Sequence, residues 1–141
     1  MAMKNALDKM FNIVFSLKKN VKTQIDVQAL DITPMHFGVI RIVRKHQPCT
    51  VNVLAQHIER DKAQVTRLVN SLVEQNMISR EPNPEDKRSQ FLNLEPSGEK
   101  IFQKLEGIGE IVTQKMFKGI SKKDQDLYEE ITIKILENLS N

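Results

Sequence analysis

Two short amphipathic segments, separated by only two residues, most restrict what this 141-residue chain can fold into. The three- and four-residue spacing of apolar side chains predicts helices over 51–59 and 62–75. Thr50 and Asp61 are the expected N-caps, and Gln64 stands three residues after Asp61, as in a capping box. Two helices this short and this close are typical of a helix-turn-helix.

Two short strands are expected directly after the second helix. Residues 77–81 and 89–94 have the character of strands, and the intervening segment 82–88 (PNPEDKR) has turn-forming residues with charge at its tip. Leu92 and Leu94 share one face of their strand, so we expect that face to pack on the helices. This order of elements predicts a winged helix-turn-helix.

The remainder of the chain is predicted to be helical. Apolar spacing indicates helices over 3–28, 33–46, 96–117 and 121–139. The expected fold class is therefore mainly α with a small β-wing. Because residues 31–100 alone account for a compact winged domain, the apolar stripes of the terminal helices need each other or a second copy of the chain.

Composition excludes several classes of protein. The chain is 40% hydrophobic and 28% charged, which is ordinary for a globular protein, and its single cysteine rules out an intrachain disulfide. No apolar run approaches the roughly 18 to 20 residues of a membrane-spanning helix, and the N-terminus lacks a secretory cleavage signal. We therefore expect a cytoplasmic protein without a membrane partner.

The predicted helix 62–75 has two distinct faces. Its apolar residues gather on one side, while the opposite side carries Ala63, Arg67 and Asn70, flanked by Gln64 and Thr66. These side chains are small, polar or cationic, so the face suits the major groove of double-stranded DNA.

Arginine is the side chain best suited to bidentate contacts with phosphate and guanine, and all arginines of the chain lie between residues 41 and 88. The net charge is only +3, so charge alone does not establish a polyanionic partner. Arg67 is the strongest candidate for a guanine or phosphate contact, and the alternative is a surface ion pair with Glu74 or Glu59.

The tip of the predicted hairpin is the second candidate contact with DNA. The guanidinium of Arg88 suits a narrow minor groove, where negative potential is concentrated, and the alternative is a solvated hairpin tip. Lys62, Lys87 and Thr50 are candidates for phosphate contacts. Lys62 and Thr50 also start helices, where backbone N–H groups favour an anion.

Three segments together resemble the MarR-type (multiple antibiotic resistance regulator) family of transcriptional regulators. They are ITPMHFGVIRIV, TVNVLAQHI and DKAQVTRLVNSLVEQNMISREPNPEDKRSQFLNLEPSGEKI, and they cover roughly residues 31–101. The pattern V-T-R-L-V followed by D-x-R-S is the most specific part of the resemblance. The chain departs from the family at Glu95-Pro96, where Thr-Pro is usual, and at Val53, where an acidic residue is usual.

The resemblance implies a homodimer that binds a pseudo-palindromic operator. In such a dimer the first, fifth and sixth helices intertwine, residues 62–75 lie in the major groove and Arg88 reaches the flanking minor groove. Asp86 would orient Arg88, because the family's wing aspartate holds the wing arginine. The family includes many repressors that small, often phenolic, ligands or oxidation release.

From these expectations we divide the chain into three segments of one intertwined domain per protomer. They are an N-terminal dimerisation helix (1–30), a winged helix-turn-helix DNA-binding domain (31–100) and C-terminal dimerisation helices (101–141). The expected partners are double-stranded DNA, a second copy of the chain and a small aromatic or phenolic effector.

The effector would lie in the crevice between the helical dimer region and the winged domain. Phe11, Phe15, His36 and Arg41 are the residues that we expect to line that crevice. A ligand there would change the distance between the two winged domains of the dimer only if it bound one arrangement of the dimer more tightly than the other.

Two alternatives to a DNA-binding regulator remain open. One is a protein-interaction module that has the winged fold but no specific DNA binding. The other is a redox sensor based on Cys49, which precedes a helix N-terminus and follows His46 by three residues. The sequence has no recognisable motif for catalysis or for a cofactor, and His46, Cys49 and His57 do not have the spacing of a metal site.

Overall fold

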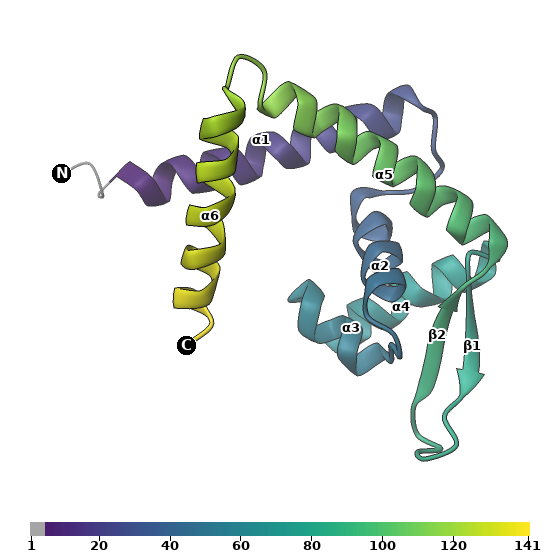
Figure 1. Cartoon of the computed structure of the whole chain (residues 1–141). Coiled ribbons are helices and arrows are strands. Elements are labelled where there is room, and N and C mark those ends of the chain that lie inside the picture. The colour runs from purple at the N-terminus through teal and green to yellow at the C-terminus, as the bar shows by residue number, and fades with distance from the viewer. Residues whose placement is uncertain (1–4) are drawn as a thin grey trace. The chain divides into compact units, whose positions relative to one another are not determined.

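The computed structural model describes residues 5–141 and confirms the predicted fold class: helices with one small antiparallel sheet (Figure 1). Each predicted element is present with its ends within three residues of the expectation, although residues 3–4 of the predicted first helix lie outside the described residues. The elements are α1 (Ala6–Val27), α2 (Pro34–Lys45), α3 (Val51–Ile58), α4 (Lys62–Glu74), β1 (Ile78–Pro82), β2 (Gln90–Leu94), α5 (Pro96–Met116) and α6 (Lys122–Leu139).

The chain forms two compact units, which we describe separately. The first extends to Gly109 and holds α1 to α4, the hairpin and most of α5, while the second spans Glu110–Asn141. Within the described residues, no helix combines the length and the apolarity needed to cross a membrane. The predicted partition at residues 30 and 100 is a division by function, and it stays a prediction.

Side-chain caps fix where four of the helices begin. Thr33, Thr50, Asp61 and Ser121 each accept a hydrogen bond from the backbone N–H three residues later. Such a cap satisfies one of the donors that a helix start leaves without an intrahelical partner. Of the capping box expected at Asp61, the structure shows the half in which Asp61 accepts from Gln64 at 2.9 Å. A reciprocal box forms instead at α2, where the Nδ1 atom of His36 accepts from the backbone N–H of Thr33.

The strands β1 and β2 form a hairpin whose register places Arg80 opposite Leu92. Leu92 is fully buried, as the alternation in its strand predicts, whereas Leu94 is half-buried. Leu92 also pairs with Cys49, whose carbonyl oxygen accepts from the Leu92 N–H at 2.7 Å. The hairpin is thereby attached to the segment that leads into α3.

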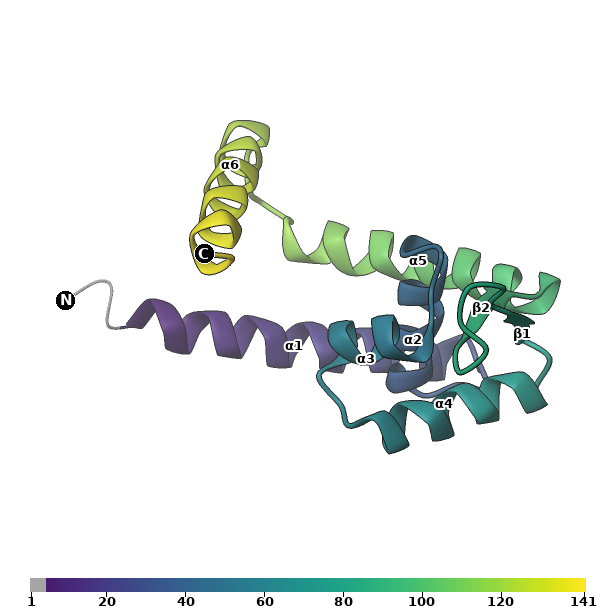
Figure 2. The same ribbon diagram turned by 90° about the horizontal axis from the view of Figure 1, so that it is seen from below.

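The core of the first unit is apolar, and among the described residues no polar or charged side chain is buried in it. Figure 2 shows α3 and α4 beside the hairpin, and contacts join α4 to β1 and α3 to β2. The buried side chains of α2, α3, α4 and the hairpin are Val39, Ile40, Val43, Leu54, Val65, Val69, Leu72, Ile78 and Leu92. Burying apolar side chains is the main favourable term in folding, so this cluster holds the winged region together.

The first part of α5 is attached to α2 and to the start of the hairpin. Arg44 pairs with Glu99 at 3.2 Å, and its guanidinium lies over the ring of Phe102, 5.6 Å from the ring centroid. Gly98 packs so closely on the residue before β1 that an added Cβ would lie 2.2 Å from the carbonyl oxygen of Met77. Only glycine fits at this position without a shift of the backbone.

Both ends of the chain carry exposed apolar side chains. On the first half of α1, Leu7, Met10, Phe11, Ile13, Val14 and Phe15 are exposed. On α6 the exposed apolar residues are Leu127, Tyr128, Ile131, Ile133, Leu136 and Leu139. Large apolar surfaces of this kind are uncommon on monomeric proteins.

Candidate nucleic-acid interface

The helix α4 presents a polar face away from the core. Val65, Val69 and Leu72 are buried, while Ala63 and Arg67 on the other side of the helix are exposed, as are Gln64 and Asn70. This division agrees with the two faces that the sequence predicts, because residues three and four apart share a face of a helix.

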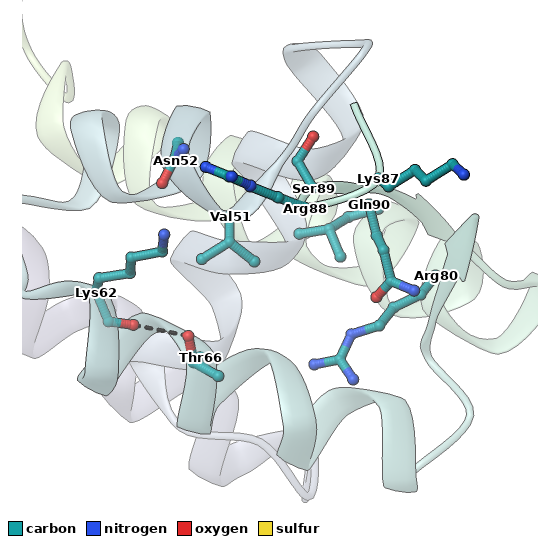
Figure 3. A pocket seen from close by; sticks show the side chains of 10 residues that line it. Val51, Asn52, Lys62, Thr66, Arg80, Lys87, Arg88, Ser89 and Gln90 are labelled. Carbon is teal, nitrogen blue, oxygen red and sulfur yellow. Dashed lines mark hydrogen bonds between the residues drawn. The ribbon is translucent and has the colours of Figure 1, made fainter. Parts of the chain in front are cut away.

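The hydroxyl of Thr66 donates its hydrogen to the carbonyl oxygen of Lys62 at 2.8 Å (Figure 3). A hydroxyl bonded back to its own helix keeps its lone pairs free, so it is left as a hydrogen-bond acceptor. Thr66 is half-buried and lines the wall of a groove.

A cationic groove of about 250 Å³ separates α4 from the hairpin. Lys62, Arg80, Lys87 and Arg88 contribute four positive charges, and no acidic residue lines it (Figure 3). The remaining lining residues are Val51, Asn52, Thr66, Ser89, Gln90 and Leu92. Such a groove raises the local concentration of anions, above all of a polyanion such as the phosphate backbone of DNA.

The loop between the strands is shaped by its own polar side chains. Asp86 Oδ1 accepts from the backbone N–H of Arg88 at 2.9 Å, and Asn83 Oδ1 accepts from the backbone N–H of Glu85 at 3.0 Å. Asx turns of this kind fix a local backbone bend. Asp86 thus fixes the backbone at Arg88, and the Arg88 side chain lines the groove (Figure 3). That Asp86 orients the Arg88 side chain for DNA stays a prediction.

The start of α3 lies at the other wall of the groove. The hydroxyl oxygen of Thr50 accepts from the N–H of Val53 at 3.2 Å, and Val51 and Asn52 line the groove directly after it. A helix N-terminus carries partial positive charge from its free N–H groups, which adds to the cationic character of this wall.

Comparison with known proteins gives a match that includes most of the residues lining this groove. Residues 30–89 match the sequence model of the MarR family. This segment, 60 of the 141 residues, is similar to the MarR family. The resemblance stated from the three sequence segments is thus confirmed.

Curated relatives of the chain include an uncharacterised HTH-type transcriptional regulator of Staphylococcus aureus. It is 31% identical over 65 residues, which are 46% of this chain and 44% of that protein. The match therefore spans less than half the length of that relative.

Two solved structures show the same fold over nearly the whole chain. Wild-type MarR of E. coli in its apo form has a TM-score of 0.81 at 23% identity, covering 93% of this chain and 96% of the other. The MepR–DNA complex of S. aureus has a TM-score of 0.75 at 20% identity, covering the same shares. At these identities the likeness concerns the fold.

One residue of the matched segment lines the groove but was not predicted as a site residue. Arg80 reaches the groove from β1, and its guanidinium donates to the Oδ1 atom of Asn70. Strand alternation is the signal that could have found it, because Ile78 and Arg80 share a face of β1 and Ile78 is buried against the helices. Asn52 and Gln90 also line the groove and were not predicted.

The four residues expected to bind an effector lie on α1 and α2. Phe11 and Phe15 are 65% and 71% exposed on α1, and Arg41 is exposed on α2. The His36 ring is engaged with Thr33 at the start of α2, and partial burial lowers its pKa. Their joint role in binding an effector stays a prediction.

The environment of Cys49 disfavours the redox alternative. Its side chain is fully buried, and desolvation raises the pKa of the thiol to about 11. Since the thiolate is the reactive form, a thiol kept neutral in the core is a poor sensor of oxidants. The rings of His46 and His57 stack on each other at 4.0 Å, and no three potential metal ligands gather among residues 5–141.

Proposed function

We propose that the protein regulates transcription by binding double-stranded DNA in a sequence-specific way. The cationic groove between α4 and the hairpin carries the proposal, because its four positive charges lie beside a helix face free of bulky apolar residues. Phosphate contacts supply most of the affinity for DNA, and base-edge contacts supply the specificity.

In this function α4 enters the major groove. Arg67, Asn70 and Gln64 are exposed on α4, and each can hydrogen-bond to base edges. Lys62, Lys87 and Thr50 contact phosphates, and Arg88 reaches the flanking minor groove from the loop that Asp86 shapes.

The protein acts as a homodimer on a pseudo-palindromic operator. The exposed apolar residues of α1 support this assembly, as do those of α6, because a second copy would remove both surfaces from water. A two-fold symmetric dimer binds two half-sites about one helical turn apart.

Regulation is by repression in the cytoplasm, through occlusion of a promoter. A small aromatic or phenolic effector that contacts Phe11, Phe15, His36 and Arg41 would release the operator if it bound the spacing of the free dimer more tightly than that of the bound dimer. The aromatic and cationic chemistry of these four side chains supports an aromatic acid or a phenolate as the ligand.

Selection from random DNA duplexes, with bound fractions sequenced at several salt concentrations, tests the proposed function. We expect an inverted repeat, two chains per duplex by light scattering, and an affinity that falls steeply with salt. Absence of binding even at low salt would overturn the proposal in favour of a protein-interaction module. Binding without sequence preference would overturn its specificity.

Arg88→Ala tests the contribution of the hairpin tip. We expect weaker binding across different sequences and a salt slope that is shallower by about one, as for the loss of one phosphate-type contact. Lys104→Ala is the matched control, since this exposed lysine of α5 does not line the groove. Equal losses of DNA affinity in the two variants would contradict the role assigned to Arg88.

A further inference from the structure

A contact between the hairpin and α4 fixes the orientation of one side chain on the proposed DNA-reading face. The Nη2 atom of Arg80 on β1 donates to the Oδ1 atom of Asn70 on α4. A guanidinium has donors only, so the atom of the Asn70 amide that faces it must be the oxygen. The NH₂ group of Asn70 is the part of the amide left for another partner.

Asn70 lies where α4 can meet the edges of base pairs. It follows Ala63 by seven residues, Thr66 by four and Arg67 by three, so the four share one face of the helix. Asn70 is exposed, whereas its neighbour Val69 is fully buried.

The strand that carries Arg80 is held firmly relative to α4. The N–H of Met77 donates to the carbonyl oxygen of Leu72 at 2.9 Å, which ties the end of α4 to the start of β1. Arg80 then stands opposite the fully buried Leu92 in the hairpin. The neighbouring carboxylate of Glu81 accepts from Asn93 at 3.1 Å instead of pairing with Arg80.

An asparagine reads adenine through both atoms of its amide. The oxygen accepts from the adenine N6 amino group while the NH₂ donates to N7. An oxygen already bound to a guanidinium is turned toward that partner, and the remaining NH₂ can only donate. Such a bond is accepted in the major groove by guanine at O6 and N7, by thymine at O4 and by adenine at N7, whereas cytosine presents only a donor. A lone donor therefore lacks the two-bond match that gives asparagine its preference for adenine, and it disfavours cytosine.

We propose that Arg80 is a specificity-determining residue of this protein. By holding the Asn70 oxygen it makes Asn70 a lone donor, which removes the preference of a free asparagine for adenine and leaves discrimination only against cytosine at the base that Asn70 meets. This inference rests on the proposed function, since it concerns how the same helix face reads DNA.

Selection from random duplexes with wild type, Asn70→Ala and Arg80→Met tests the inference. Asn70→Ala identifies the base pair that Asn70 reads, because the discrimination against cytosine there should disappear. In Arg80→Met the freed amide should enrich adenine at that position about fivefold or more, which is the lower end of the discrimination that a bidentate base contact provides. Lys87→Met is the matched control, because it removes one charge from the same groove. It should weaken binding without changing the preferred base.

A second variant keeps Arg80 in place and does not depend on the folding of Arg80→Met. Asn70→Asp replaces the donor with an acceptor, so the preference should move to cytosine, whose N4 amino group donates to a carboxylate. Preferences unchanged from wild type in Arg80→Met, or in Asn70→Asp, would overturn the role of Arg80. Failure of the wild type to select any sequence would instead overturn the proposed function.

Discussion

Replacing Gly98 with alanine should destabilise the protein, although the same change usually stabilises a helix. An added Cβ would lie 2.2 Å from the Met77 carbonyl oxygen and 3.1 Å from its carbonyl carbon, and both atoms belong to the backbone. The oxygen must therefore move by more than 1 Å to reach ordinary contact. It is also the acceptor for the N–H of Glu95 at 2.9 Å, so moving it weakens that bond.

The magnitude follows from these two contacts. Overpacking costs typically about 1–3 kcal/mol, and a lost backbone hydrogen bond costs about 0.5–1.5 kcal/mol. The opposing gain from replacing glycine in a helix interior is at most about 1 kcal/mol, and it is smaller in the first turn of α5. We expect the free energy of unfolding to fall by about 1–3 kcal/mol, measured by urea denaturation followed by circular dichroism at one protein concentration.

Gly38→Ala is the matched control. Gly38 lies inside α2, and apart from its chain neighbours and the backbone of its own helix no heavy atom of the described residues lies within 4 Å of the place where its Cβ would be. Alanine there should therefore raise the urea midpoint. The reasoning would be refuted by a Gly98→Ala midpoint equal to or above that of the wild type while Gly38→Ala shows its expected rise.

Two further predictions concern the segment that leads into α3. Burial raises the pKa of the Cys49 thiol to about 11 from an unfolded value of 9.0. The folded thiol should therefore react with iodoacetamide at pH 8 much more slowly than the thiol of the urea-unfolded chain. Similar reaction rates would contradict the burial of this side chain. Since the folded state keeps its proton between these pKa values while the unfolded state loses it, this group should lower the free energy of unfolding as pH rises above about 9. Thr50→Ala removes the acceptor for the Val53 N–H and should lower the free energy of unfolding by about 0.5–2 kcal/mol, measured by urea denaturation. Thr113→Ala, at an exposed position of α5, should lower it by less. Equal decreases in the two variants would argue against the cap.

The helices were predictable because their starts depend on residues close in sequence. Thr33, Thr50 and Asp61 cap their helices through bonds that span three residues, so the signal is complete within a short window. The polar face of α4 was predictable for the same reason, since the period of a helix alone assigns Arg67 and Asn70 to one side.

The groove could only be predicted in part, because it joins segments far apart in sequence. Lys62, Lys87 and Arg88 were expected from their places at a helix start and a hairpin tip, and the structure brings them to one groove. The contribution of Arg80 depends on the register of the hairpin and on the turn between α4 and β1. No local pattern specifies that combination.

The attachment of β2 to Cys49 limits which changes in chain length the hairpin can accept. Side chains alternate between the two faces of a strand, so one residue inserted into β2 would place Phe91 or Asn93 where Leu92 is buried. A residue inserted between Asn83 and Arg88 leaves every strand pair intact and changes only how far the tip extends. Insertions and deletions in relatives with this hairpin should therefore accumulate at the tip, where they adjust reach across the DNA without disturbing the core.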